Sequence, residues 1–146
     1  FVHTHAEELT RIVLEVHLEH VAAELAADEH GDLVPTGEPE PRWRFTSRLP
    51  YLERIVREAV ITESLDRSLM LPPDALAPRP PTDGGHFHPS GVPLVNFLTA
   101  PFYLFDAMDT LEKIHQPSLV PITRAAIRMI HATRGVSAAA MRQNDD

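Results

Sequence analysis

Apolar and polar residues alternate along residues 12–21 (IVLEVHLEHV), and this period of two predicts a strand. One face of that strand carries mainly isoleucine, leucine and valine, and the other carries Glu15, His17 and Glu19. An amphipathic helix is the rival interpretation, especially if the apolar spacing continues through residues 20–30. Residues 3–11 are expected to form one or two helical turns, with Thr4 as the N-cap.

Two later segments have the spacing of amphipathic helices. Residues 50–64 begin with a proline, which suits a first helical turn, and residues 118–133 precede Gly135, which is a common stop signal. The apolar side chains that we expect to face the core are Leu52, Ile55, Val56, Ala59 and Val60 in the first helix, and Leu119, Ile122, Ala126, Ile127 and Ile130 in the second.

The rest of the chain alternates short apolar runs with segments rich in proline and glycine. Residues 68–71 and 92–98 indicate buried strands, whereas residues 28–45 and 72–81 indicate long excursions. Residues 134–146 are expected to be a frayed tail. This order predicts an α/β fold, with a sheet of about three or four strands, mixed or parallel, flanked by helices.

Composition limits the possible partners. A chain of 146 residues that is 43% hydrophobic can form a single domain with its own core. A net charge of −8 argues against nucleic acids and anionic membranes. Arg42, Arg44 and Arg48 lie close together, but Glu38 and Glu40 sit beside them, so a solvated loop is favoured over a binding patch. There are no cysteines, which excludes disulfides and thiolate metal sites.

No targeting or membrane segment is evident. No apolar run approaches the roughly 18 residues that a membrane span needs, and no signal-peptide pattern is present. We therefore expect a soluble protein and favour the cytoplasm. The chain begins at Phe1 rather than methionine. We expect that cleavage or trimming removed a leader or an upstream domain.

The run His17-Leu18-Glu19-His20 is the first candidate for chemistry. On a strand, His17 and Glu19 point the same way about 7 Å apart. Imidazole nitrogen and carboxylate oxygen are ligands that zinc accepts, and His20 is a further donor nearby. A complete site needs a ligand from elsewhere in the chain. The alternative is a polar strand face on which a glutamate is paired.

A second candidate is His86-Phe87-His88, which follows Asp83-Gly84-Gly85. The glycines allow tight turns, so this loop can present its histidines to a metal or to a substrate carboxylate. Asp83 can fix the tautomer of a histidine. In the alternative interpretation, Phe87 plugs the core and both histidines are solvated.

A third candidate is the run Asp106-Ala107-Met108-Asp109-Thr110. Its simplest role is to cap a following helix through Asp109 or Thr110, with Glu112 in support. No serine lies in a G-x-S-x-G pattern, which disfavours a serine hydrolase. Neither a P-loop nor a G-x-G-x-x-G motif is present.

The order of these segments resembles the C-terminal part of the di-zinc aminopeptidase superfamily, which includes glutamate carboxypeptidase and glutaminyl cyclase. The residues that carry the resemblance are Thr82-Asp83-Gly84, Phe87, Gly91-Val92-Pro93, the strand that follows, Tyr103-Leu104-Phe105 and Asp109-Thr110, together with residues 12–21 upstream. The resemblance implies a three-layer zinc-exopeptidase fold, a peptide substrate, and Glu19 at the position of an aspartate zinc ligand.

The chain departs from this family at residues that the chemistry needs. The family's last zinc ligand, a histidine, falls on Phe105, and Asp106 is one residue out of register. The first ligands and the paired glutamates lie upstream of any residue present here. We expect Asp83, His86, His88, Asp106 and Asp109 to contact the substrate or to support the ligands.

Two interpretations follow. In one, the chain is part of a larger zinc-dependent hydrolase and is inactive by itself, with ligands rearranged to His17, His20 or Asp106. In the other, it belongs to a degenerate, non-catalytic protein that serves binding or assembly. Because a truncated sheet exposes an edge, we expect a homo-oligomer or association with the missing N-terminal part.

Overall fold

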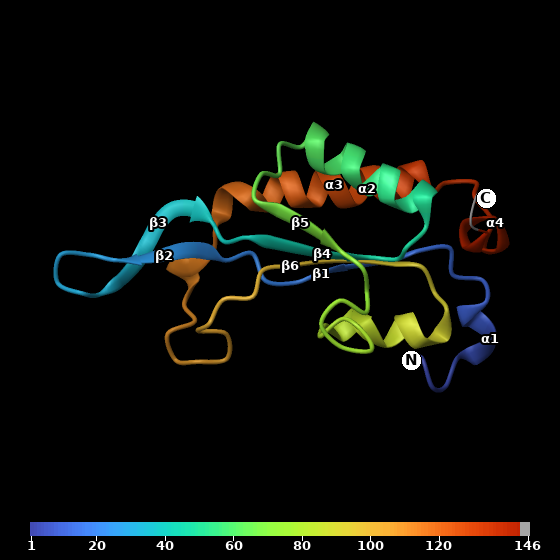
Figure 1. Ribbon diagram of the computed structural model, residues 1–146, viewed down its shortest axis with the longest axis horizontal. Helices are drawn as coiled ribbons and strands as arrows, with labels where there is room; N and C mark the ends of the chain where they lie inside the picture. The colour runs from blue at the N-terminus through green and yellow to red at the C-terminus, as the bar shows by residue number, and fades with distance from the viewer. Residues whose placement is uncertain (144–146) are drawn as a thin grey trace.

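The computed structural model describes residues 1–143, and its centre is a four-stranded sheet (Figure 1). The strand order is β1 (Glu15–Leu18), β6 (Leu94–Leu98), β4 (Arg42–Thr46) and β5 (Ser68–Leu71). β1 is parallel to β6, β6 is antiparallel to β4, and β4 is parallel to β5. The sheet is therefore mixed, and the predicted α/β class is confirmed.

Two helices, α2 (Pro50–Thr62) and α3 (Leu119–Ala132), cover one face of the sheet (Figure 1). Their apolar stripes pack against Val95 and Phe97 of β6. The buried residues of the two helices in this core are Leu52, Ile55, Val56, Ala59, Ile122, Ala125 and Met129. This face holds the main apolar core, because both helices and the central strand contribute fully buried side chains.

The prediction for the inner side of α3 was partly wrong. Ile127 and Ile130 are 47% and 54% exposed, and Leu119 is 45% exposed. Ile122 and Met129 face the core instead. Five residues after Ile122, at 100° per residue, Ile127 has rotated about 140° away, so both cannot face the sheet.

The 3₁₀ helix η1 (Asp83–Ser90) lies over the other face of the sheet, against β1 and β6 (Figure 1). Phe45, Leu94 and Leu98 form a smaller apolar cluster on this face. A separate two-stranded hairpin, β2 (Ala23–Ala27) and β3 (Leu33–Pro39), projects from one end of the molecule (Figure 1).

The predicted excursion over residues 28–45 was therefore wrong. It contains β3 and the central strand β4, in which arginines alternate with Trp43 and Phe45. Arg42 and Arg44 are buried beneath the helices, so the interpretation of the arginine cluster as a solvated loop was wrong for them, whereas Arg48 is exposed. Arg42 donates hydrogen bonds to the Asp66 carbonyl and the Ser118 hydroxyl, which compensates its burial.

Other boundaries follow the sequence more closely. The strand in residues 12–21 is confirmed over Glu15–Leu18, so the helical alternative is wrong, and α1 spans Ala6–Leu9. Residues 111–118 form only short 3₁₀ turns, η2 (Leu111–Lys113) and η3 (Gln116–Ser118), and neither Asp109 nor Thr110 caps η2 through its side chain.

The chain beyond Gly135 is not wholly frayed. It forms α4 (Ala138–Arg142), whose Arg142 donates hydrogen bonds to the carbonyl oxygens of Leu9, Ile12 and Gly91. Residues 144–146 of the predicted tail lie outside the described residues. No helix within residues 1–143 is long and apolar enough to cross a membrane.

Candidate metal-binding site

Strand β1 directs three titratable side chains toward η1. Glu15, His17 and Glu19 follow each other at intervals of two, so all three emerge on the same face. His17 Nε2 lies 2.8 Å from Glu19 Oε2, and His17 Nδ1 lies 3.7 Å from Glu15 Oε1. The imidazole therefore stands between two carboxyl groups.

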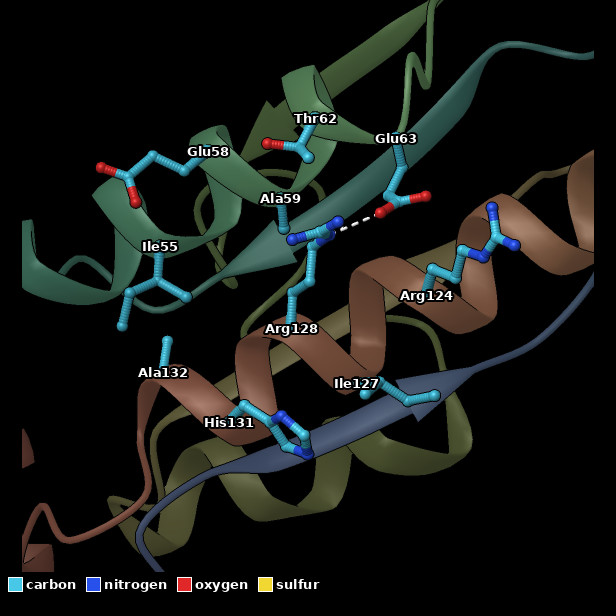
Figure 2. A pocket seen from close by; sticks show the side chains of 10 residues that line it. All are labelled: Ile55, Glu58, Ala59, Thr62, Glu63, Arg124, Ile127, Arg128, His131 and Ala132. Carbon is cyan, nitrogen blue, oxygen red and sulfur yellow. Dashed lines mark hydrogen bonds and ion pairs between the residues drawn. The ribbon is translucent and has the colours of Figure 1, made fainter.

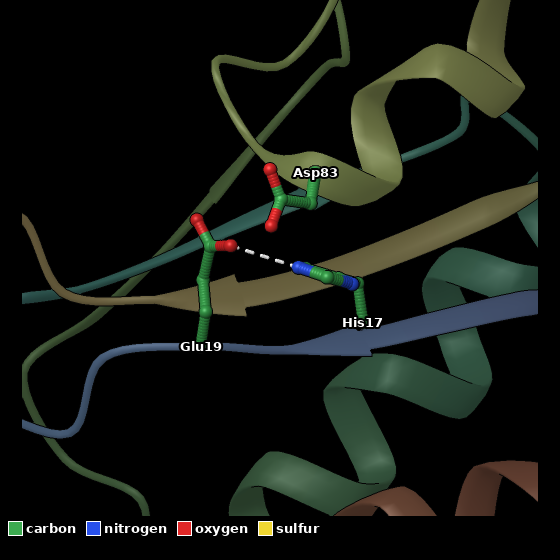
Figure 3. Close-up of side chains that lie close together, drawn as sticks. All are labelled: His17, Glu19 and Asp83. Atoms are coloured by element: carbon green, nitrogen blue, oxygen red, sulfur yellow. Dashed lines mark hydrogen bonds and ion pairs between the residues drawn. The ribbon is translucent and has the colours of Figure 1, made fainter.

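Asp83, the first residue of η1, brings a third carboxyl group to this place. Ligand atoms of His17, Glu19 and Asp83 all lie within 4.8 Å of one another. Figure 3 shows the Asp83 carboxylate pointing toward the pair formed by His17 and Glu19. One nitrogen and two oxygen donors thus lie close together, although they come from the sheet and from the helix that packs on it.

Gly84 allows η1 to approach β1 closely, and Gly85 allows η1 to pack against the Pro80 carbonyl group. A Cβ at Gly84 would lie 2.6 Å from Glu15 Oε1 and 2.8 Å from His17 Cβ, and a Cβ at Gly85 would lie 2.1 Å from the Pro80 carbonyl oxygen. The sequence predicts tight turns at these glycines. Neither has a positive φ, so what requires them is the lack of space for a side chain.

A buried polar chain supports the cluster from β6. Thr82 Oγ1 donates to Asn96 Oδ1 at 2.5 Å, and Asn96 Nδ2 donates to Glu15 Oε2 at 2.7 Å. Asn96 is fully buried. Because every link satisfies a buried polar atom, the chain holds the Glu15 carboxyl in one position beside His17.

Burial raises the pKa of Glu15 from 4.5 to about 7. The hydrogen bond from Asn96 and the nearby His17 lower this pKa in part, while the Glu19 carboxylate raises it further. A carboxyl group with this pKa gains or loses a proton near neutral pH, so it is able to exchange a proton with a neighbouring group.

A cleft of about 830 Å³ opens beside the cluster. Glu19 and Asp83 line it together with the proline-rich segment 77–81 and with Leu104 and Phe105. A small molecule that enters this cleft therefore reaches two of the three converging donors.

The other predicted site residues lie around this cleft or away from it. His20 lines it, and its Nδ1 is 3.8 Å from Glu19 Oε1, but its ring does not join the three converging donors. His86 lines the cleft and is exposed. His88 borders a different pocket, with Ser47 and Arg48. Asp106 and Asp109 lie on an exposed loop, where Asp106 accepts a hydrogen bond from the Met108 amide.

A further groove, of about 560 Å³, lies between α2 and α3 on the other face of the sheet (Figure 2). Arg128 donates a hydrogen bond to the Glu63 carboxylate across it. In this view Glu58 and His131 point away from that pair and from each other. The groove therefore lacks the convergence of donors seen around His17.

Three members of the site network, Glu15, Asn96 and Thr82, were not predicted as site residues. The alternation in residues 12–21 places Glu15 on the face of His17 and Glu19, and this signal was sufficient to include it. No sequence pattern connects Asn96 or Thr82 to that face. Comparison with protein families, curated proteins and solved structures finds no match to this chain.

Proposed function

We propose that this domain binds a divalent transition-metal ion through His17, Glu19 and Asp83. The observation that carries the proposal is the convergence of their ligand atoms within 4.8 Å of one another. One imidazole and two carboxylates form a donor set that zinc accepts at four-coordinate sites. A set of three protein ligands leaves one position open, as catalytic rather than structural zinc sites do.

The neighbouring residues suit this role. Glu15, next to Nδ1 of His17, is placed to orient the imidazole so that Nε2 faces the metal. Binding requires Nε2 to give up its hydrogen bond with Glu19. Asn96 and Thr82 keep Glu15 in place while this exchange occurs. A bound zinc ion supplies Lewis-acid chemistry, which polarises a carbonyl group or acidifies water.

More broadly, we propose that this domain is the C-terminal part of a metallo-aminopeptidase-like hydrolase, which acts on peptide or related amide bonds. The support for it is the resemblance in motif order, together with the cleft that opens beside Glu19 and Asp83. The chain alone is expected to be inactive, because the paired glutamates of that family have no counterpart in it. In the second candidate function, a degenerate relative uses the same fold for binding or assembly. The aromatic residue at position 105, where the family has a histidine ligand, favours this candidate.

Calorimetric titration with Zn²⁺, Mn²⁺ and Mg²⁺ tests the metal proposal. We expect one zinc ion per chain, bound more tightly than magnesium, and at least about a tenfold loss of zinc affinity in His17→Ala and Asp83→Asn. His88→Ala and Asp109→Asn are matched controls outside the cluster and should bind as the wild type does. Equal zinc affinity in all five proteins would refute the site.

Turnover separates the two candidate functions. With zinc and an aminoacyl chromogenic substrate, the chain alone is expected to show none, and clear turnover would contradict its assignment as inactive. A longer protein that contains this domain should hold about two zinc ions and cleave the substrate if it is a hydrolase. If it holds none and does not cleave, the binding or assembly function is supported.

A further inference from the structure

Strand β1 has an unpaired edge. The amides of Glu15 and Glu19 donate to the carbonyl oxygens of Pro93 and Phe97 at 2.8 and 2.9 Å. Because backbone groups alternate in direction along a strand, the N–H and C=O groups of Leu14, Val16 and Leu18 point away from β6. No other strand in residues 1–143 pairs with this edge, so its hydrogen-bonding groups are free to pair with a further strand.

The opposite edge of the sheet is less suited to such pairing. β5 has four residues, and Pro72 and Pro73 follow it directly. Proline lacks an amide proton and is a common means of blocking an edge strand. Residues 12–19, in contrast, contain no proline and extend the open side of β1 in both directions.

We propose that two copies of the chain associate edge to edge through β1, antiparallel, with Val16 of one copy opposite Val16 of the other. Hydrogen bonds can form only between outward-facing groups, so Val16 has three possible partners: Leu14, Val16 or Leu18 of the second copy. The polar residues between them, Glu15, His17 and Glu19, decide which of these registers is favoured.

Only the register with Val16 opposite Val16, which we call the central register, places unlike groups opposite each other. It sets each Glu15 opposite His17 of the second copy, so a carboxyl group faces an imidazole twice. With Leu14 as partner, Glu15 faces Glu15 of the second copy. With Leu18 as partner, His17 faces His17 of the second copy, and Glu15 faces Glu19. Like groups directly opposite each other destabilise a strand pair.

The central register also brings the second copy to the candidate site. Glu15 and His17 of the second copy form a non-hydrogen-bonded pair, in which Cα atoms lie only about 4.5 Å apart. His17 of the second copy is therefore added beside the Glu15 carboxyl. The association itself does not need a metal ion, so it stands or fails independently of the proposed metal site.

Exposed apolar side chains of both copies lie on one face of the joined sheet, the face that the helices cover. A two-fold axis perpendicular to the sheet keeps the helical layers of both copies on one face. Leu18 is 44% exposed and shares a small cavity with Ile122, which places α3 near this edge. Ile127 and Ile130, on the outer side of α3, are about half exposed. Their burial between two copies would add apolar contact to the strand pairing.

Cysteine cross-linking tests the register, because the chain has no cysteine of its own. In EDTA under mild oxidation, Val16→Cys should form a disulfide-linked dimer, since residues 16 of the two copies face each other within disulfide reach. In this register residue 18 of one copy lies about 13 Å from residue 18 of the other. Leu18→Cys is therefore the matched control that should remain unlinked. Equal or stronger linking of Leu18→Cys would refute the register.

Sedimentation in EDTA tests whether the chain dimerises through the open edge of β1. Val16→Pro removes an outward N–H and leaves the ladder to β6 intact, so we expect dimerisation to weaken about tenfold or more. Met70→Pro removes an outward N–H from β5 and should dimerise as the wild type does. Circular dichroism checks that both variants are folded. A wild-type chain that stays monomeric at high concentration, or equal losses in both variants, would overturn the proposal.

Discussion

Asn96 donates a hydrogen bond of 2.7 Å to Glu15, and this bond joins the buried strand β6 to the face of β1 that carries the candidate site. The Glu15 side chain is only 11% exposed. The single hydrogen bond does not offset the loss of water around the carboxylate, so the ionised form of Glu15 remains unfavourable in the folded protein.

The first prediction is a loss of stability between about pH 5 and 8. The pKa of Glu15 is about 7 in the folded protein and 4.5 as a free group, so the folded state holds the extra proton in this window. Stability is therefore full below pH 4.5 and falls as the pH rises through 7, by at most about 3 kcal/mol. Urea unfolding at pH 5 and pH 8, in EDTA, measures the difference.

Glu15→Gln should remove most of that difference, because the amide stays neutral and its oxygen still accepts the bond from Asn96. Glu58→Gln, on the exposed side of α2, is the control and should keep the wild-type dependence. A Glu15→Gln variant that loses as much stability as the wild type between these pH values would show that Glu15 is not the group responsible.

Gly84→Ala is predicted to destabilise the protein by about 1–3 kcal/mol, because the added methyl group meets Glu15 and His17 at 2.6 and 2.8 Å. It should also weaken zinc binding, since η1 carries Asp83. Gly91→Asn is the control. Gly91 has a φ of +69° and no atom near its Cβ position, and asparagine tolerates this conformation. Urea unfolding and calorimetric titration of both variants measure the effects, and equal behaviour of the two would contradict this account of Gly84.

The two buried arginines of β4 should respond in opposite ways to substitution. Within residues 1–143, the guanidinium nitrogens of Arg44 have no hydrogen-bond partner, and the group only stacks 4.9 Å from the centre of the Phe97 ring. Burial lowers its pKa to about 9, so its charge is costly. Arg44→Met should therefore stabilise the fold by about 1–3 kcal/mol.

Arg42→Met is the matched comparison. It leaves the Asp66 carbonyl and the Ser118 hydroxyl without their donor, so it should destabilise the fold by a similar amount. Thermal or urea unfolding of both variants shows whether each substitution raises or lowers the free energy of unfolding. A destabilised Arg44→Met would mean that the contact with Phe97 outweighs the missing hydrogen bonds.

Local patterns predicted part of this structure and long-range contacts decided the rest. The alternation in residues 12–21 and the spacing in residues 50–64 identified β1 and α2, because each depends only on which side of one element is apolar. The strand β4 was missed because Arg42 and Arg44 have the polarity of a solvated loop. Their burial depends on Phe97 and Ser118, far away in the sequence.

In the candidate site, too, local patterns predicted part of the arrangement and long-range contacts decided the rest. Period two predicted that His17 and Glu19 share a face. Asp83 joins them because Gly84 lets η1 lie directly on β1, and residue types alone do not reveal that packing. His88 appeared equivalent to His86 in the sequence, yet the 3₁₀ turn of η1 sends the two side chains to different pockets.

The last prediction concerns Phe105, which has a φ of +68° and is 93% exposed. A bulky residue in this conformation is strained, and its apolar ring gains little from burial. The proposed relation to the zinc hydrolases places a histidine ligand here, and Phe105 lines the same cleft as Glu19. Phe105→His should therefore tighten zinc binding about tenfold, because it adds a fourth donor.

Phe105→Asn separates this effect from relief of backbone strain. Asparagine tolerates a positive φ but provides no imidazole, so this variant should gain some thermal stability and bind zinc as the wild type does. Calorimetric titration of the three proteins gives the comparison. If Phe105→His binds zinc no better than Phe105→Asn, position 105 does not reach the metal, and the proposed relation to the zinc hydrolases loses its register at this residue.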